Sequence, residues 1–369
     1  MKILFDHQVF SVYKYGGVSR YFVELTRELR KINHTETELS CSFSYNEVLL
    51  DSHLYPVKPF FRDHPFKGRG RLLSYINKPG SKSKIRQAAF DIFHPTYYDY
   101  YFLSDLGKKP FVVTCHDLIH EKFTDRFPTL TMDRLQSKGK KEILEKADRI
   151  IAVSHNTKKD ILEHYSVDPD KIRVIHLAHQ QSTIFSLPGT GKELPGNYFL
   201  YVGNRDVYKN FLPFLEAIAP ILKKNKDLTF LCAGGGDFSV EERHTIHRLD
   251  IRDQVSHTGI DSRGVDALYR NALAFFFPSL YEGFGIPVLE ALSNGCPAVL
   301  SNTSSLPEVA GEAALYFDPS DPASMYKAAV AILDNGTLRQ HLQKTGPERA
   351  ALFSWKKCAL ETYNLYGEL

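Results

Sequence analysis

The sequence predicts an α/β protein built from two doubly wound, Rossmann-like domains. The length of 369 residues is enough for two domains of about 150–200 residues each. A strand, a glycine pair and a helix follow one another near the start of the chain, and a second unit of this kind begins at Tyr198. Between the two units, residues 181–197 are rich in Ser, Thr, Pro and Gly, which is typical of a linker.

Composition excludes several other classes of protein. Apolar residues make up 43% of the chain, which supports full-sized cores and argues against disorder. The formal net charge is only +3, so no nucleic-acid partner is expected. No apolar run approaches the roughly 18 residues of a membrane-spanning helix. The five cysteines are scattered without CxxC spacing, which argues against a zinc site and favours a reducing cytoplasm.

The first domain is expected over residues 1–180. A strand from Lys2 to Phe5 leads to Gly16-Gly17, and a helix with a regular apolar face follows from about Ser19 to Lys31. The glycine pair fits either a plain tight turn or a place where the backbone approaches a phosphate or an acceptor closely. No GxGxxG motif is present, which counts against a dinucleotide dehydrogenase.

Residues 54–89 are less regular, and the part over 67–86 is basic. Its cations are Lys67, Arg69, Arg71, Lys78, Lys82, Lys84 and Arg86. A solvated surface explains them, and so does contact with an anionic membrane or a lipid-diphosphate acceptor. We therefore expect a cytoplasmic protein and leave open a peripheral contact with the inner face of the membrane through 67–86.

Two further segments of the first domain carry candidate acceptor-side residues. Five aromatic residues lie within 97–102, so Tyr97 and Tyr98 are candidates for a wall against a sugar, with core packing or a subunit contact as equal alternatives. The next strand, from Phe111, ends in His116 and Asp117. Because the carboxyl ends of parallel strands face the binding crevice, we expect His116 there; a buried structural histidine is the competing interpretation.

A helix over 133–147, a strand over 149–153 and an N-cap at Ser154 complete the first domain. The second domain is expected over 198–350. Its first strand, Tyr198 to Val202, leads to a turn that holds Arg205 and Lys209. Cations at a strand-to-helix turn suit a diphosphate, although a solvated turn would also hold them.

The most informative stretch reads AFFFPSLYEGFGIPVLEALSNG and ends at Gly295. It predicts a buried strand, a glycine loop, and a short helix with Pro287 in its first turn. Such a helix start presents free N–H groups and the positive end of the helix dipole, which suits phosphate. Glu282 lies in the loop and Glu290 lies one turn into the helix.

Carboxylates repel phosphate oxygens but accept hydrogen bonds from sugar hydroxyls. A diphosphate with a sugar on each side is a nucleotide sugar, which therefore fits Glu282, Glu290 and the helix start together. A loop cap and a solvated helix position are the plain alternatives for these two glutamates.

The segments FPSLYEGFGIPVLEA and SNTSSLPEVAGEAALYFDP resemble the E-x7-E region of the retaining family-4 glycosyltransferases with the GT-B fold. They are most similar to the subgroup that transfers mannose or similar sugars in bacterial surface-polysaccharide assembly. The resemblance implies two Rossmann-like domains that face an open cleft, and a last helix over 351–369 that returns to the first domain. It implies transfer of a hexose, mannose by this likeness, from GDP-mannose or a UDP-sugar to a glycan or lipid-linked glycan.

The resemblance also implies roles for single residues. His116 and Glu282 are the expected catalytic pair at the transferred sugar, with Asp117 orienting His116 or pointing at the acceptor. The expected donor-binding residues are Gly16, Gly17, Arg205, Lys209, Phe284, Gly285, Ile286 and Glu290. Among these, Arg205 is the weaker assignment, because some relatives carry the arginine directly after the glycine, where this chain has Asn204.

No metal and no cofactor besides the donor are expected, because cations and amides would stabilise the leaving diphosphate. Asp168-Pro169-Asp170 matches the manganese-binding D-x-D pattern of the other large glycosyltransferase fold, but Pro169 suits a turn there, so we expect no metal site. Two other functions stay open: a nucleotide-sugar epimerase of similar fold and a non-catalytic nucleotide-sugar-binding subunit.

Overall fold

The computed structural model describes residues 1–62, 64, 66–127, 134–179, 194–259 and 265–369. These divide into two compact units. Unit 1 comprises Met1–Leu177 together with Trp355–Leu369, and unit 2 comprises Ala178–Ser354. Most of the predicted linker, 181–197, lies outside the described residues. Both units combine parallel strands with helices, which confirms the predicted fold class.

Unit 1 is built on two three-stranded parallel sets that meet at one edge. The first set is β2 (Glu36–Ser40), β1 (Lys2–Asp6) and β5 (Ile92–His94), and the second is β6 (Val112–Cys115), β7 (Arg149–Ala152) and β8 (Ile172–Val174). A single parallel bridge between Phe93 and Phe111 joins β5 to the edge of β6. The order β2-β1-β5-β6-β7-β8 is that of a doubly wound sheet.

The remaining elements of unit 1 cover these strands. They are α1 (Gln8–Val12), α2 (Gly17–Leu29), β3 (Phe43–Ser44), α3 (Glu47–Ser52), β4 (Lys58–Pro59), α4 (Arg69–Gln87), α5 (Ile119–Phe123), α6 (Arg134–Lys146), α7 (His155–His164) and the short η2 (Pro169–Lys171). The Ser154 side chain accepts a hydrogen bond from the Thr157 N–H at 3.0 Å, so the predicted N-cap of α7 is present. Asp168 caps η2 in the same way, as a turn residue.

Helix α4 corrects the expectation of an irregular segment over 54–89 for its second part, because residues Arg69–Gln87 form a helix of 19 residues. Its buried positions recur every four residues, but three of them are the polar or charged residues Arg69, Asn77 and Ser81. The Asn77 side-chain oxygen accepts from the Ser42 and Phe43 N–H groups, each at 3.1 Å. Polar side chains with distant hydrogen-bond partners therefore interrupt the apolar stripe by which helices are predicted from sequence.

Unit 2 is a six-stranded parallel sheet in the order β11-β10-β9-β12-β13-β14. The strands are β9 (Asn197–Val202), β10 (Leu228–Ala233), β11 (Val255–Thr258), β12 (Ala274–Phe277), β13 (Ala298–Ser301) and β14 (Ala314–Phe317). The helices are η3 (Val207–Lys209), α8 (Phe211–Lys224), α9 (Val240–Arg248), η4 (Arg252–Gln254), α10 (Val265–Asn271), α11 (Ile286–Ser293), α12 (Leu306–Ala310), α13 (Pro322–Asp334) and α14 (Gly336–Ala350).

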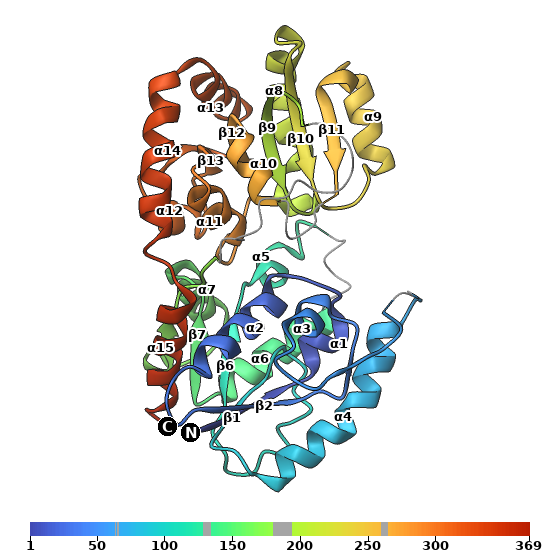
Figure 1. Ribbon diagram of the computed structural model, residues 1–369, viewed down its shortest axis with the longest axis vertical. Coiled ribbons are helices and arrows are strands. Elements are labelled where there is room, and N and C mark those ends of the chain that lie inside the picture. Colours follow the sequence, from blue (N-terminus) through green and yellow to red (C-terminus); the bar gives the residue numbers. More distant parts are fainter. Residues whose placement is uncertain (63, 65, 128–133, 180–193, 260–264) are drawn as a thin grey trace. The chain divides into compact units, whose positions relative to one another are not determined.

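Both faces of the unit 2 sheet are covered, which explains the uninterrupted apolar run of β12. On one face, the Phe214 ring of α8 packs against Phe276 of β12 with centroids 5.1 Å apart. On the other face, Phe275 of β12 packs against Tyr269 of α10 at 5.4 Å. Figure 1 shows these helices around the strands of unit 2.

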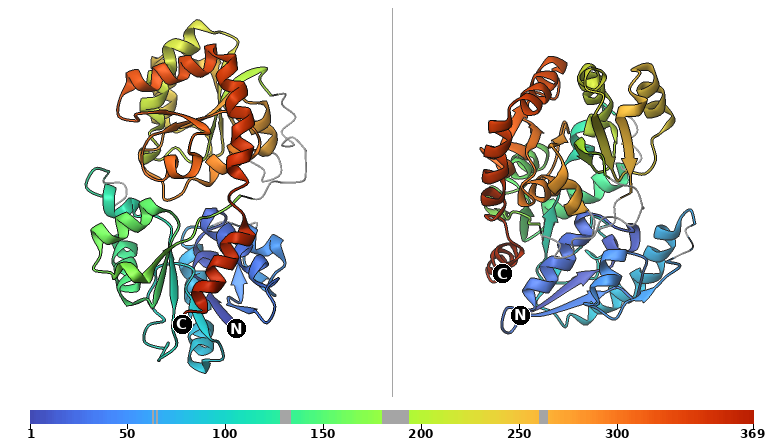
Figure 2. Two further views of the ribbon diagram at one scale, coloured as in Figure 1. Left: turned by 90° about the vertical axis from the view of Figure 1, so that its left-hand side faces the viewer. Right: turned by 45° about the horizontal axis from the view of Figure 1, so that its top comes forward.

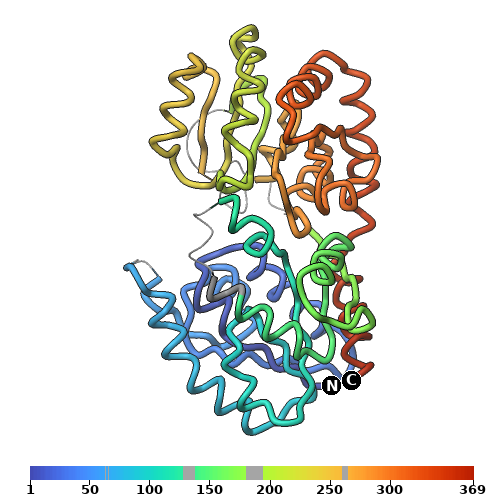
Figure 3. The backbone as a smooth tube through the Cα atoms, turned by 180° about the vertical axis from the view of Figure 1, so that it is seen from behind, coloured from blue at the N-terminus to red at the C-terminus, as the bar shows by residue number. Residues whose placement is uncertain are grey.

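The last helix, α15 (Trp355–Tyr366), belongs to unit 1 and packs against α2. Both views of Figure 2 show α15 lying along unit 1, and in Figure 3 the two chain ends lie close together there. The Tyr366 hydroxyl is 2.6 Å from Nδ1 of the buried His94. The end of the chain is therefore part of the core of unit 1.

We expect Leu365→Ala to destabilise unit 1 by about 2–5 kcal/mol, because it removes a buried side chain and leaves a cavity. Leu365 is 1% exposed, whereas Leu360 on the same helix is 49% exposed. The matched variant Leu360→Ala should therefore leave stability nearly unchanged. Urea unfolding followed by circular dichroism checks this, and equal effects of the two variants would show that α15 does not contribute to the core.

Candidate active site

The predicted donor-binding residues of unit 2 gather where its strand order reverses. β9 pairs with β12, through Phe199 with Ala274 and Leu200 with Phe275, while the chain continues from β9 to β10 on the other side. The loops that leave the carboxyl ends of β9 and β12 are therefore neighbours. Doubly wound sheets bind ligands at this position, because the two loops diverge there and leave room between them.

An ion pair joins these two loops. Lys209 Nζ, at the end of η3, donates to Glu282 Oε1 at 2.6 Å, and the two side chains are only 14% and 11% exposed. Burial lowers the pKa of Lys209, but the adjacent Glu282 carboxylate outweighs burial and holds that pKa above its usual value. Lys209 therefore stays charged near neutral pH, and the structure brings together two residues that lie 73 positions apart in the sequence.

The loop that carries Glu282 is fixed by hydroxyl groups that follow β13. The Glu282 N–H donates to Ser304 Oγ at 3.0 Å, and Ser305 Oγ donates to the Glu282 carbonyl at 2.9 Å. Thr303 Oγ1 donates to the Leu280 carbonyl at 3.1 Å. Sequence reasoning used this Ser/Thr segment only as part of a resemblance and assigned it no role. These bonds hold the Glu282 backbone in one position.

The start of α11 has the geometry that the sequence predicts. Gly285 takes the left-handed conformation with φ 93°, and a Cβ atom there would lie 3.0 Å from Leu306 Cδ2. Among the described residues, no side chain caps the first turn of α11. The Phe284 ring is buried against Phe353, with centroids 5.9 Å apart, so Phe284 can reach a ligand only through its backbone.

Glu290 lies on α11 with a partner that sequence reasoning missed. The Tyr269 hydroxyl donates to Glu290 Oε2 at 3.1 Å, and His179 Nδ1 lies 3.8 Å from Oε1. Tyr269 is fully buried, and burial, reinforced by the Glu290 carboxylate, raises its pKa well above the usual value, so it remains a donor. A tyrosine on the preceding helix carries no local signal that identifies it as a partner of Glu290.

The Arg205 side chain is bound by other groups of unit 2. Its guanidinium donates to Glu242 Oε1 at 2.8 Å and to the carbonyls of Gly234 and Gly236 at 2.9 and 2.7 Å. The turn after β10 is packed around it, because a Cβ on Gly235 would lie 2.9 Å from an Arg205 nitrogen. This arrangement favours a structural role. The predicted contact of Arg205 with a diphosphate stays a prediction.

In unit 1, His116 follows β6 directly, at the carboxyl end as predicted. Its ring packs edge-on against Tyr21 with centroids 5.2 Å apart. Nε2 is buried and has no hydrogen-bond partner among the described residues. Burial lowers the pKa of His116 to about 4, despite the opposing effect of Asp117. The imidazole is therefore neutral near pH 7, and its contact with a sugar stays a prediction.

The other predicted acceptor-side residues differ in their surroundings. Tyr98 is buried in the core of unit 1, and its hydroxyl accepts from the His116 N–H at 3.1 Å, which favours core packing over a wall against a sugar. The Tyr97 hydroxyl is 2.7 Å from that of Tyr13. Asp117 Oδ1 accepts from the Ile119 N–H at 3.2 Å, at the start of α5. Gly16 is the N-cap of α2, and both Gly16 and Gly17 are exposed.

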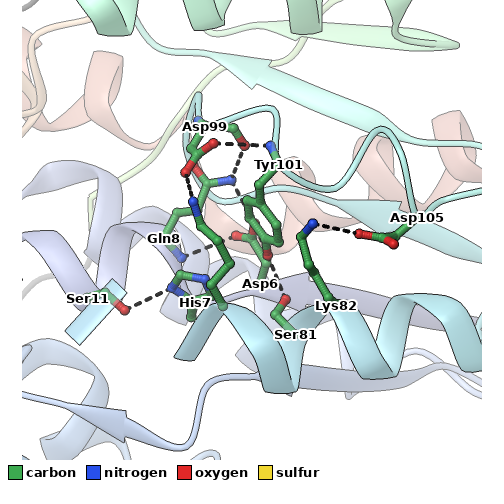
Figure 4. Close-up of polar contacts among 10 residues, drawn as sticks. Asp6, His7, Gln8, Ser11, Ser81, Lys82, Asp99, Tyr101 and Asp105 are labelled. Carbon is green, nitrogen blue, oxygen red and sulfur yellow. Dashed lines mark hydrogen bonds and ion pairs between the residues drawn. The ribbon is translucent and has the colours of Figure 1, made fainter. Parts of the chain in front are cut away.

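Sequence reasoning missed a buried polar cluster at the carboxyl end of β1 (Figure 4). Asp6 is fully buried and accepts from Thr96 Oγ1 at 2.8 Å, Gln8 Nε2 at 2.7 Å and the Tyr101 hydroxyl at 3.1 Å. The only sequence signal is an acidic residue at the end of an apolar strand. Because Thr96 follows β5, this cluster ties together the loops after the two paired strands β1 and β5.

Comparison with known proteins identifies two domains in the chain. Residues 15–178 match the model of Glycosyltransferase Family 4, and residues 186–349 match that of Glycosyl transferases group 1. The chain is 27% identical to O-antigen chain mannosyltransferase B of Escherichia coli, over 99% of each chain.

Solved structures share the fold along the whole chain. Sucrose-phosphate synthase from Thermosynechococcus elongatus superposes with a TM-score of 0.76 at 21% identity, over 100% of this chain and 98% of the other. HepE of Anabaena in complex with UDP and glucose superposes with a TM-score of 0.74 at 16% identity, over 100% of both chains.

We expect the imidazole of His116 to stay neutral from about pH 5 to pH 8. Because its folded pKa of about 4 lies below the usual histidine pKa of 6.5, His116 protonates more readily in the unfolded chain, and stability is lost as the pH falls from 6.5 towards 4. Ring ¹⁵N shifts of histidine-labelled protein, assigned with His116→Gln, measure this. A titration midpoint near 6.5 would show that the His116 ring is exposed to solvent and not buried.

Proposed function

The chain belongs to the glycosyltransferases that join a family 4 domain to a group 1 domain, and from its site we propose the donor, the residue roles and the course of the reaction. As an enzyme of polysaccharide biosynthesis with the GT-B fold, it would move a hexose from a nucleoside-diphosphate sugar to a glycan or lipid-linked glycan. The observation that carries the proposal is the Lys209–Glu282 pair beside the uncapped start of α11. The name of the Escherichia coli relative supports mannose as the hexose.

The diphosphate of the donor would lie at the start of α11. Gly285 and Ile286 begin α11, so their N–H groups would donate to phosphate oxygens at the positive end of the helix dipole. Lys209 supplies the full positive charge, since its ammonium is held nearby by Glu282. In this largely buried position a cation acts more strongly on the phosphates than it would in water.

Glu282 and Glu290 would bind the two sugars of the donor. Glu282 is held by its backbone and by Lys209, which leaves its second oxygen to accept from hydroxyls of the transferred sugar. The Tyr269 hydroxyl donates to Glu290 Oε2, and we propose that this bond orients the carboxylate towards the hydroxyls of the ribose. UDP and glucose bound to HepE support a nucleotide sugar as the ligand class.

Charge builds on the leaving diphosphate as the glycosidic bond breaks, and Lys209 with the helix N–H groups is placed to stabilise it. We propose that the diphosphate oxygen takes the acceptor proton while the acceptor oxygen attacks the same face of the sugar, so that the configuration is retained. Glu282 is a poor candidate for a nucleophile, because its carboxylate is paired with Lys209. His116, neutral near pH 7, would hydrogen-bond the sugar rather than carry charge.

The proposed cation and amides take the part that a divalent metal plays in other transferases, so we propose a reaction without metal or further cofactor. We also propose that the enzyme works in the cytoplasm, at the inner face of the membrane, where a lipid-linked acceptor would lie. All five cysteines are buried and free, which supports a reducing compartment.

We expect Glu290→Ala to weaken binding of the nucleoside diphosphate by about tenfold or more, because it removes charged hydrogen bonds to the ribose. A thermal-shift screen against UDP, GDP, dTDP and ADP first selects the nucleotide. Calorimetry then compares it with its 2′,3′-dideoxy form. Wild-type protein should lose affinity for the dideoxy form, and Glu290→Ala should not distinguish the two. A variant that still prefers the ribose would contradict this role.

We expect Lys209→Met to lower kcat by about 100-fold or more, because the leaving group loses its preorganised cation. Lys226, an exposed lysine of unit 2, gives the matched control Lys226→Met, which should keep full activity. EDTA should leave the wild-type rate unchanged in the same assay of sugar transfer. A strict requirement for manganese would overturn the metal-free scheme.

A further inference from the structure

Large apolar side chains are exposed around the start of α4. Phe61 and Phe66 precede the helix and are 57% and 44% exposed, and Leu72, Tyr75 and Ile76 lie on its first turns at 43%, 79% and 38%. We call these five residues, with Lys67 and Arg71, the α4 patch. Soluble surfaces carry single apolar residues without consequence, but a group of five in 16 consecutive positions indicates a binding surface.

The helix geometry explains why these side chains share one side. Leu72, Tyr75 and Ile76 are spaced by three and four residues, so they form one stripe on α4. The buried positions Leu73 and Asn77 face a different side of the helix. The exposed stripe therefore lies outside the buried core of unit 1.

The segment before the helix is tied to α4. Arg69 donates to the Phe61 carbonyl at 2.7 Å, and the Phe61 and Phe66 rings pack edge-on with centroids 5.7 Å apart. Beside the stripe lies an open cavity of about 530 Å³, lined by residues that include Val12, Arg71 and Tyr75. The patch is thus a shaped surface with an apolar floor and cations at its margin.

Charge is concentrated in the same place. The later cations of α4 are neutralised within unit 1, as in the pairs Lys82–Asp105 at 3.1 Å, drawn in Figure 4, and Lys84–Glu38 at 2.6 Å. Lys78 and Arg86 pair with Asp99 and Asp105, each at 2.7 Å. By contrast, Lys67 and Arg71 enter no ion pair among the described residues, and no acidic residue occurs between 64 and 90.

We propose that the α4 patch docks the enzyme on an anionic phospholipid bilayer. Aromatic and aliphatic side chains enter the boundary between headgroups and acyl chains, while Lys67 and Arg71 face lipid phosphates. A bilayer is the partner that needs both an apolar stripe and unpaired positive charge. No helix of the described residues could span a membrane, so the attachment is peripheral. The proposed docking surface is formed by the start of α4 and the residues just before it, rather than by the whole basic segment 67–86.

The inference deepens the membrane location proposed for the enzyme, and its test does not depend on sugar transfer. Full-length protein is sedimented with vesicles of phosphatidylcholine alone or with added phosphatidylglycerol. Wild-type protein should bind the anionic vesicles, less so at high salt. The apolar variant Leu72→Ser/Tyr75→Ser and the charge variant Lys67→Gln/Arg71→Gln should each lose about tenfold or more in affinity.

The matched control is Val240→Ser/Lys226→Gln in unit 2, which changes an apolar residue that is 77% exposed and a cation outside the patch. It should bind as wild type does. Equal binding by the patch variants and wild type, or no wild-type binding to anionic vesicles, would overturn the proposal. Sedimentation velocity tests whether a second copy of the chain covers the patch instead. If the wild-type protein is a dimer, if Leu72→Ser/Tyr75→Ser makes it a monomer, and if lipid binding is unchanged, the patch is a dimer interface.

Discussion

The buried ion pair between Lys209 and Glu282 is the constraint on which the site depends. Two charges with so little exposure must lie together, since removal of either would leave the other uncompensated. They can meet only because β9 and β12 are hydrogen-bonded neighbours, although the strands β10 and β11 and the helices α8, α9 and α10 lie between β9 and β12 in the sequence. The fold of unit 2 and the chemistry of its site are therefore parts of one arrangement.

The surroundings of this pair keep its geometry fixed. The hydroxyls of Ser304 and Ser305 hold the backbone of Glu282, Gly285 begins α11 in a conformation that suits glycine, and Tyr269 directs Glu290. Each group is positioned by a neighbour outside the motif that carries it. Preorganisation of this kind is what stabilises charge in a transition state, because no reorientation has to occur during the reaction.

The two doubly wound units use equivalent positions for different purposes. In unit 2, the loops after the neighbouring strands β9 and β12 present the cation of Lys209 and the carboxylate of Glu282. In unit 1, the corresponding loops are joined by Asp6, which accepts hydrogen bonds from Gln8, Thr96 and Tyr101. A fully buried carboxylate with several donors is stable without a ligand. Unit 1 thus combines a rigid polar core with an exposed surface at α4.

The sequence by itself determined the elements whose signals are local. Strand, glycine turn and helix were predicted around Gly16 and around Gly285, as were the cap at Ser154 and the placement of Glu282 and Glu290, because spacing along the chain decides them. Tertiary structure decided everything that depends on distant partners. It made a helix of α4, whose buried face is partly polar, it drew Arg205 into a packed turn, and it placed Tyr98 in the core. The physical reason is that a polar side chain buried by its own fold and one that awaits a ligand look alike in sequence, and only the positions of their partners distinguish them.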